Sequence, residues 1–341
     1  MRGARGARLT FAKGGPKRLG PTGPLRTCQR AVITGHKVMR TDLDHLPEAK
    51  RAELARIVEI LFSEFEDALA CGSKPHKKQG RILKIILFGS YARGDWVDDP
   101  VGGYVSDYDL LVVVNYEQLT DLEYWAKADE HLLRELAITQ RLSAPANFIV
   151  HSLQDVNQRL SQGRYFFSDI VREGVALYEA PAHPFARVEP LPPVTELADA
   201  TEYFQYWHRS AGRYLQTGVE HTSRGWSNEA AFELHQATER LYHCVLLVLT
   251  LYSPKSHKLN FLRSQAEQLD GRLAAAWPRG TRFERRCFEL LRKAYVEARY
   301  SPNYEITAEE LAWLGARVSH LQTLVAEVCE ARLAELRQKI A

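Results

Sequence analysis

The sequence lacks long apolar runs and paired cysteines. No stretch of its 341 residues approaches the roughly 20 consecutive apolar residues that a membrane-spanning helix needs. The basic N-terminus has no apolar segment of the kind that a signal peptide carries. The cysteines form no CxxC pair and have no histidine partner at zinc-finger spacing. We therefore expect a cytoplasmic protein with no membrane association and with reduced thiols. The five cysteines are Cys28, Cys71, Cys244, Cys287 and Cys329.

Acidic residues are absent from positions 1–38, which contain nine of the 45 lysines and arginines. The other 36 basic residues face 42 acidic ones, so the rest of the chain has a net charge of −6. Residues 1–38 have many glycines and prolines and no apolar period, so they cannot bury enough surface to offset the entropy of ordering. We interpret them as a basic disordered tail or an upstream extension before Met39. A nucleic-acid-binding arm is the alternative.

Residues 39–180 alternate between helical and strand patterns. Apolar residues recur at helical spacing from 46 to 70, and a second helical pattern covers 119–142. Short apolar runs predict buried strands at 81–88, 110–114 and 147–152. This alternation predicts an α/β domain, with a mixed sheet flanked by helices.

The composition changes after residue 180. Five of the chain's 15 prolines fall within 181–194, which we interpret as a semi-rigid linker between two domains. Every patterned segment in 195–341 is helical, and prolines lie between the segments rather than within them. We expect a bundle of about five helices there. The expected helices are 195–217, 226–250, 257–269, 281–298 and 307–337.

A glycine-rich turn and two aspartates lie between the first two predicted strands, in "LFGSYARG" and "SDYDLLVVV". Gly89 lets the backbone approach a phosphate closely, and neighbouring amides with the Ser90 hydroxyl can hold a polyphosphate. Asp107 and Asp109 are separated by one residue at a strand start, so both side chains project from the same face. Carboxylates that close repel each other unless a cation lies between them, and Mg²⁺ suits such a site.

Together these motifs resemble the nucleotidyltransferase superfamily of the DNA polymerase beta type, particularly its minimal bacterial members, over residues 40–180. The resemblance implies that Asp107 and Asp109 are catalytic and hold Mg²⁺ or Mn²⁺, which bridges a nucleoside triphosphate and activates an attacking hydroxyl. ATP is the favoured donor. It also implies that Gly89 and Ser90 contact the phosphates and that Arg93 neutralises the departing pyrophosphate.

The superfamily usually takes a third carboxylate from a later strand, where this sequence has Asn147. An amide can ligate Mg²⁺ through its oxygen, so Asn147 is a third candidate ligand, but it brings no charge and is a poor base. Asp98, Asp99 and Asp155 are acids that could substitute. The insert "DWVDDPVGG", residues 95–103, is expected to form a lid or a partner contact.

Residues 227–262 and 292–307 resemble the HEPN domain, a helical bundle that often accompanies minimal nucleotidyltransferases. This resemblance covers 195–337. Many HEPN domains are RNases with an arginine followed four to six residues later by histidine, and two copies face each other in a dimer. Here Tyr304 stands at the histidine position after Arg299, and a phenol with a pKa near 10 is a poor base at neutral pH. RNase activity is therefore not expected.

The remaining "ARYSPNY" resembles variant HEPN domains that are thought to bind nucleotides. The resemblance implies a groove in which Arg299 binds phosphate and Tyr300 and Tyr304 stack. His235 and Glu239, four residues apart on one helix, are candidates to line the same groove. Alternatively, Arg299 caps the C-terminus of its helix.

Three functions remain open from the sequence. The first is transfer of a nucleoside monophosphate, with AMP favoured, to a hydroxyl group. The acceptor hydroxyl belongs either to a small molecule or to a HEPN tyrosine, Tyr300 or Tyr304, in the same chain or in a partner. The second is an aminoglycoside-type adenylyltransferase. The third is a catalytically lapsed nucleotide-binding module, which Asn147 and Tyr304 favour. The resemblance also implies a homodimer through the helical domain, and the sequence leaves open whether nucleic acid is a partner.

Overall fold

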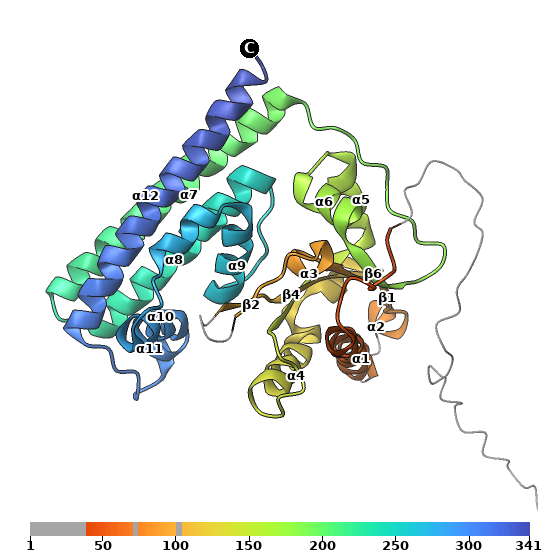
Figure 1. Ribbon diagram of the computed structural model, residues 1–341, viewed down its shortest axis with the longest axis horizontal. Helices are drawn as coiled ribbons and strands as arrows, with labels where there is room; N and C mark the ends of the chain where they lie inside the picture. The colour runs from red at the N-terminus through yellow and green to blue at the C-terminus, as the bar shows by residue number, and fades with distance from the viewer. Residues whose placement is uncertain (1–38, 71–73, 100–103) are drawn as a thin grey trace, which may run out of the picture. The chain divides into compact units, whose positions relative to one another are not determined.

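The computed structural model describes residues 39–70, 74–99 and 104–341 (Figure 1). The interpretation of 1–38 lies outside the described residues. A four-stranded mixed sheet with helices is followed by an all-helical region, which confirms the predicted fold class. Residues 180–192 belong to no helix or strand and join the two regions. No described helix is long and apolar enough to cross a membrane.

The central sheet has the strand order β5-β4-β1-β6. β4 pairs antiparallel with β1 and parallel with β5, and β6 pairs antiparallel with β1. Every residue of β1 and β4 is buried, because helices cover both faces, and this explains why the two strands are continuous apolar runs rather than alternating ones. The strands are β1 (Ile82–Phe88), β4 (Tyr108–Val114), β5 (Ala146–Ser152) and β6 (Val175–Glu179).

Helices form a layer on each face of the sheet (Figure 1). One layer contains α1 (Glu48–Ala70) and α4 (Ala126–Ala137), and the other contains α5 (Leu153–Ser161) and α6 (Tyr165–Glu173). The remaining elements are short. They are α2 (Pro75–Lys78), α3 (Ser90–Arg93), η1 (Glu117–Thr120), η2 (Leu122–Tyr124) and the small hairpin β2 (Asp98–Asp99) and β3 (Tyr104–Val105), which lies in and beside the 95–103 insert.

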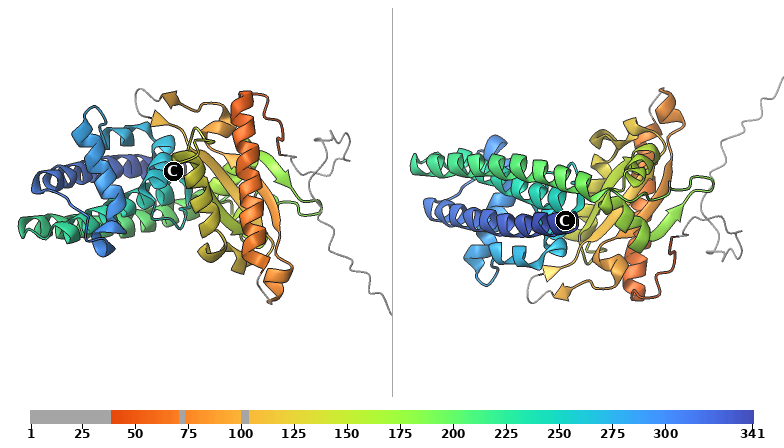
Figure 2. Two further views of the ribbon diagram at one scale, coloured as in Figure 1. Left: turned by 90° about the horizontal axis from the view of Figure 1, so that it is seen from below. Right: turned by 90° about the horizontal axis from the view of Figure 1, so that it is seen from above.

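In the helical region α7 (Pro193–Ser223) and α12 (Ala308–Gln338) run side by side (Figures 1 and 2). α8 (Ser227–Thr250) is buried along most of its length against both. The expected helix 281–298 is two helices, α10 (Arg282–Ala294) and α11 (Glu297–Tyr300), which are separated by a turn at Tyr295 and Val296. The smaller elements are α9 (Leu259–Leu269), η3 (Gly271–Ala276), α10 (Arg282–Ala294) and α11 (Glu297–Tyr300).

Tyr252, in the turn after α8, joins the helical region to the sheet layer. It is 5% exposed, and its ring stacks on Phe166 of α6 with the centroids 4.1 Å apart. His151 of β5 hydrogen-bonds Asp155 through Nδ1 at 2.7 Å, so its Nε2 accepts from the Tyr252 hydroxyl at 2.8 Å. Burial raises the pKa of Asp155, but hydrogen bonds from His151 and Arg159 prevail and lower it to about 2. Phe261 of α9 belongs to the same apolar cluster as Tyr252, so this cluster holds the beginning of α9 against the sheet layer.

Truncation of Tyr252 should therefore be strongly destabilising. We expect Tyr252→Ala to lower the free energy of unfolding by about 3–5 kcal/mol, because it leaves a cavity between the two regions. Tyr252→Phe keeps the ring and should cost about 1 kcal/mol, the value of one hydrogen bond. Tyr206→Ala is the control, since that ring is 57% exposed. Urea denaturation followed by circular dichroism measures all three, and equal losses for Tyr252→Ala and Tyr206→Ala would contradict this interface.

Candidate functional site

Asp107 and Asp109 lie together at the N-terminal end of the central strand β4. In the strand register Asp109 lies between Phe88 of β1 and Asn147 of β5. Asp107 immediately precedes β4, so the two carboxylates share one face. Asp107 is 8% exposed and Asp109 is fully buried. The spacing in the sequence therefore places two acids in a site almost without water.

Each carboxylate receives an amide hydrogen bond from a different part of the chain. Asn147 donates through Nδ2 to Oδ2 of Asp107 at 2.9 Å. Gln268, on α9 of the helical region, donates through Nε2 to Oδ2 of Asp109 at 3.4 Å. The Oδ1 atom of Asp109 is buried and has no hydrogen-bond partner among the described residues. An ionised oxygen buried in this way is unfavourable unless a cation or a proton satisfies it.

The electrostatics of the pair lead to the same conclusion. Burial raises the pKa of Asp107 to about 7, although the Asn147 hydrogen bond and the charge of Arg279 act in the opposite direction. Burial, together with the nearby charge of Asp107, holds the pKa of Asp109 well above its usual range. Two carboxylates whose protonated forms are favoured in isolation become stable anions when a cation joins them.

Gly89 directly follows β1 and lies beside the aspartates. Its φ of +74° is favourable only for glycine, and a Cβ atom there would lie 2.6 Å from Oδ2 of Asp109. The next side chain, Ser90, has a buried hydroxyl with no hydrogen-bond partner among the described residues. Arg93 follows within one turn, and its positive charge lowers the pKa of Asp109. The three residues predicted to bind phosphate are therefore grouped beside the predicted metal ligands.

These residues fit a divalent cation held by Asp107 and Asp109. The unpartnered Oδ1 atom and the two raised pKa values both call for positive charge, and Gly89 leaves room for a phosphate beside it. Asn147 directs its NH₂ group at Asp107, so in this arrangement it orients that carboxylate rather than ligating a metal.

No other acid in the described residues completes a third ligand position. Asp98 lies 3.5 Å from the ammonium of Lys50, and Asp155 is bound by His151 and Arg159. The side chain of Asp99 lies outside the described part of the chain. Across residues 39–70, 74–99 and 104–341 no group of three His, Cys, Asp or Glu side chains is arranged to hold a metal ion.

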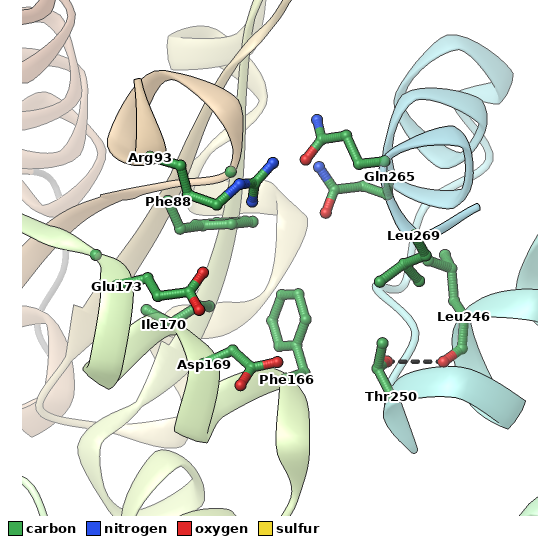
Figure 3. Close-up of a pocket in the computed structure, with 13 residues that line it drawn as sticks. Phe88, Arg93, Phe166, Asp169, Ile170, Glu173, Leu246, Thr250, Gln265 and Leu269 are labelled. Carbon is green, nitrogen blue, oxygen red and sulfur yellow. Dashed lines mark hydrogen bonds between the residues drawn. The ribbon is translucent and has the colours of Figure 1, made fainter. Parts of the chain in front are cut away.

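A cavity begins at Gly89 and Arg93 and extends between α6 and α9 (Figure 3). The motifs did not reveal Gln265 and Gln268 or the acids of α6. The sequence places the two glutamines on one face of a helix, but it contains no signal that this face meets Asp109, 159 positions before Gln268. The cavity is lined by Phe88, Gly89, Arg93, Phe166, Asp169, Ile170, Glu173, Gly174, Leu246, Thr250, Gln265, Gln268 and Leu269.

In the helical region three histidines surround the carboxylate of Glu239. His257 Nδ1 lies 3.0 Å from Oε2, His235 Nε2 lies 3.6 Å from the same atom, and His243 Nε2 lies 3.7 Å from Oε1. Burial raises the pKa of Glu239, but the hydrogen bond with His257 and the nearby rings of His235 and His243 outweigh it and hold the pKa well below its usual range. His235 is fully buried, so it belongs to the core of α8 rather than to an open groove.

The tyrosines after α10 have opposite environments. Tyr304 is 6% exposed and donates its hydroxyl to the carbonyl oxygen of Leu290 at 3.0 Å, so it is a core residue. Its expected stacking and acceptor roles do not fit this position. Tyr300 is 73% exposed. Arg299 lies with its guanidinium over the Tyr295 ring and donates through Nε to the Tyr295 carbonyl at 2.6 Å, which agrees with the helix-capping alternative.

Comparisons with known proteins agree with both halves of the fold. A nucleotidyltransferase domain model matches residues 74–152, and a HEPN domain model matches residues 204–323. A protein of Methanocaldococcus jannaschii described as "Putative protein adenylyltransferase" is 33% identical over 120 residues, which are 35% of this chain and 97% of the relative. The chain therefore belongs to the minimal nucleotidyltransferases of the DNA polymerase beta superfamily and carries a HEPN domain behind its nucleotidyltransferase domain.

Proposed function

We propose that the protein transfers AMP from ATP to a hydroxyl group in a Mg²⁺-dependent reaction. The observation that carries this proposal is the buried pair Asp107 and Asp109, in which one carboxylate oxygen has no partner, directly beside the Gly89 turn. The adenylyl group is chosen because the relative from Methanocaldococcus jannaschii is described as an adenylyltransferase.

In this proposal the site residues have separate roles in an in-line displacement at the α-phosphorus of ATP. A divalent metal bound by Asp107 and Asp109 would supply positive charge to the triphosphate and to the attacking oxygen. Gly89 lets the phosphates approach the aspartates, and Arg93 neutralises charge on the leaving pyrophosphate. As the acceptor oxygen bonds to the α-phosphorus, the bond from that phosphorus to pyrophosphate breaks and the proton of the acceptor hydroxyl is released to solvent. Asn147 keeps Asp107 oriented through its amide hydrogen bond.

Burial restricts the acceptor on the protein itself. The hydroxyl of Tyr304 is bonded inside the helical core, whereas Tyr300 is largely exposed. Of the two HEPN tyrosines, Tyr300 is therefore the candidate protein acceptor, in the same chain or in a second copy. A small-molecule hydroxyl is the alternative acceptor.

A second candidate is a nucleotide-binding module without turnover. Asn147 favours it, because an amide stands where the superfamily usually has a third carboxylate. This candidate requires ATP binding that depends on Asp107 and Asp109 with no transfer of label to protein or to small acceptors.

Transfer should depend on both aspartates. With α-³²P-labelled ATP and Mg²⁺, we expect label on Tyr300 or on an added hydroxyl compound. Asp107→Asn or Asp109→Asn should reduce the rate of label transfer more than about 100-fold. Loss of a group that only orients a metal ligand already lowers metal affinity or activity about 10- to 100-fold. Asp121→Asn, at an exposed aspartate of the same domain, is the matched control. Transfer that survives in both site variants would rule out the proposed chemistry.

A third carboxylate should make stability depend on the metal. Asn147→Asp replaces the hydrogen-bond donor to Asp107 with an acid, so three carboxylates repel each other. Without Mg²⁺ we expect this variant to melt at a lower temperature than wild type. In millimolar Mg²⁺ its melting temperature should recover. Asn147→Ala removes the donor without adding charge and should lower the free energy of unfolding by about 1–3 kcal/mol. Its melting temperature should respond to Mg²⁺ no more than that of wild type. Scanning fluorimetry with and without Mg²⁺ separates the variants. The same Mg²⁺ response in both would contradict a metal at this position.

A further inference from the structure

The cavity between α6 and α9 is directly connected to the proposed phosphate site. Gly89 and Arg93 form part of its wall, and Figure 3 shows Arg93, Glu173 and Asp169 projecting toward it from one side and Gln265 and Leu269 from the other. The cavity and the mouth through which it opens to solvent together contain about 630 Å³ of space that no protein atom fills. A group in this cavity would be adjacent to a triphosphate at Gly89.

Apolar side chains form one part of the cavity wall. Phe88 and Phe166 meet edge to face, with ring centroids 5.5 Å apart, and Ile170 and Leu269 extend this surface. Such a wall can cover the flat face of a nucleobase. The amide of Gln265 lies at the opposite wall, where it can hydrogen-bond the edge of a base.

The carboxylates of α6 form the polar part of the same wall. Asp169 and Glu173 are four residues apart and therefore lie on one helix face. Arg172 contacts Oδ1 of Asp169 at 2.6 Å and Oε1 of Glu173 at 2.8 Å. The second oxygen of each carboxylate makes no hydrogen bond to another described residue. Two acceptor oxygens thus remain one helical turn apart beside the cavity.

The charge of Arg172 determines which ligand these oxygens suit. Because Arg172 partly neutralises both carboxylates, they attract a polycation only weakly, but each keeps an acceptor for a neutral donor. A ribose provides two adjacent hydroxyl donors, and hydrogen bonds from neutral hydroxyls to ionised acceptors are stronger than those between neutral groups. Burial also raises the pKa of Asp169, as expected for an acid in a partly dry pocket.

We propose that this cavity binds the nucleoside of a ribonucleoside triphosphate, and that Asp169 and Glu173 accept hydrogen bonds from the ribose hydroxyls. The assignment rests on the proposed nucleotidyl transfer, because Gly89 and Arg93 must hold the phosphates. It makes α6 the element that distinguishes ribonucleotides from nucleotides that lack these hydroxyls, and it makes α9 of the HEPN domain the opposite wall of the nucleotide site.

Isothermal titration calorimetry of the full chain with Mg²⁺ and either ATP or 2′,3′-dideoxyATP tests this assignment. We expect wild type to bind ATP at least about 10-fold more tightly, since hydrogen bonds to charged groups are lost with the hydroxyls. Asp169→Asn and Glu173→Gln together should weaken ATP binding toward the value for dideoxyATP and leave dideoxyATP binding unchanged. Glu202→Gln, at an exposed acid of α7, is the control.

Equal affinity of wild type for the two nucleotides would overturn the ribose assignment, while transfer that depends on Asp107 and Asp109 would still support the proposed function. This comparison needs no variant, so misfolding cannot obscure it. If the double variant raises the KM for the acceptor and leaves ATP binding intact, the cavity belongs to the acceptor and the assignment fails. Absence of binding by either nucleotide would overturn both the assignment and the proposed function.

Discussion

Two carboxylates placed side by side in a dry site are the constraint on which the rest of this structure depends. Asp107 and Asp109 begin a central strand, and the helix layers remove water from them. Ionising both there is costly unless opposite charge or hydrogen-bond donors compensate. The protein supplies one amide to each, from Asn147 and Gln268, and leaves one oxygen of Asp109 unpartnered among the described residues. We interpret this incomplete compensation as the place of a cation and its triphosphate.

The same constraint gives the HEPN domain a structural role in the nucleotidyltransferase site. Gln268 on α9 reaches Asp109, and the charge of Arg279 lowers the pKa of Asp107. Tyr252, buried between α6 and β5, anchors the segment that leads into α9. Because donor groups near a metal ligand fix its orientation, a shift of α9 would alter the geometry of Asp109. Side chains from both domains thus donate hydrogen bonds to the Asp107 and Asp109 pair.

The sequence predicted those parts of the site that depend on local geometry. The spacing of Asp107 and Asp109 fixes their common face, and a glycine at the end of β1 is required by the close approach of Asp109. Gln268, Asp169 and Glu173 could not be predicted, because their positions depend on how distant helices pack across the sheet. The same holds for Tyr304, because the motif identifies its residue type but the packing of α10 and α12 determines that it is buried.

Anomalous diffraction from crystals grown with Mn²⁺ and a non-hydrolysable ATP analogue tests the central claim most directly. The account predicts a manganese peak bonded to both Asp107 and Asp109, with the triphosphate against Gly89 and Ser90 and the amide of Gln268 still beside Asp109. A nucleotide bound elsewhere, or at Gly89 with no manganese on the two aspartates, would contradict it.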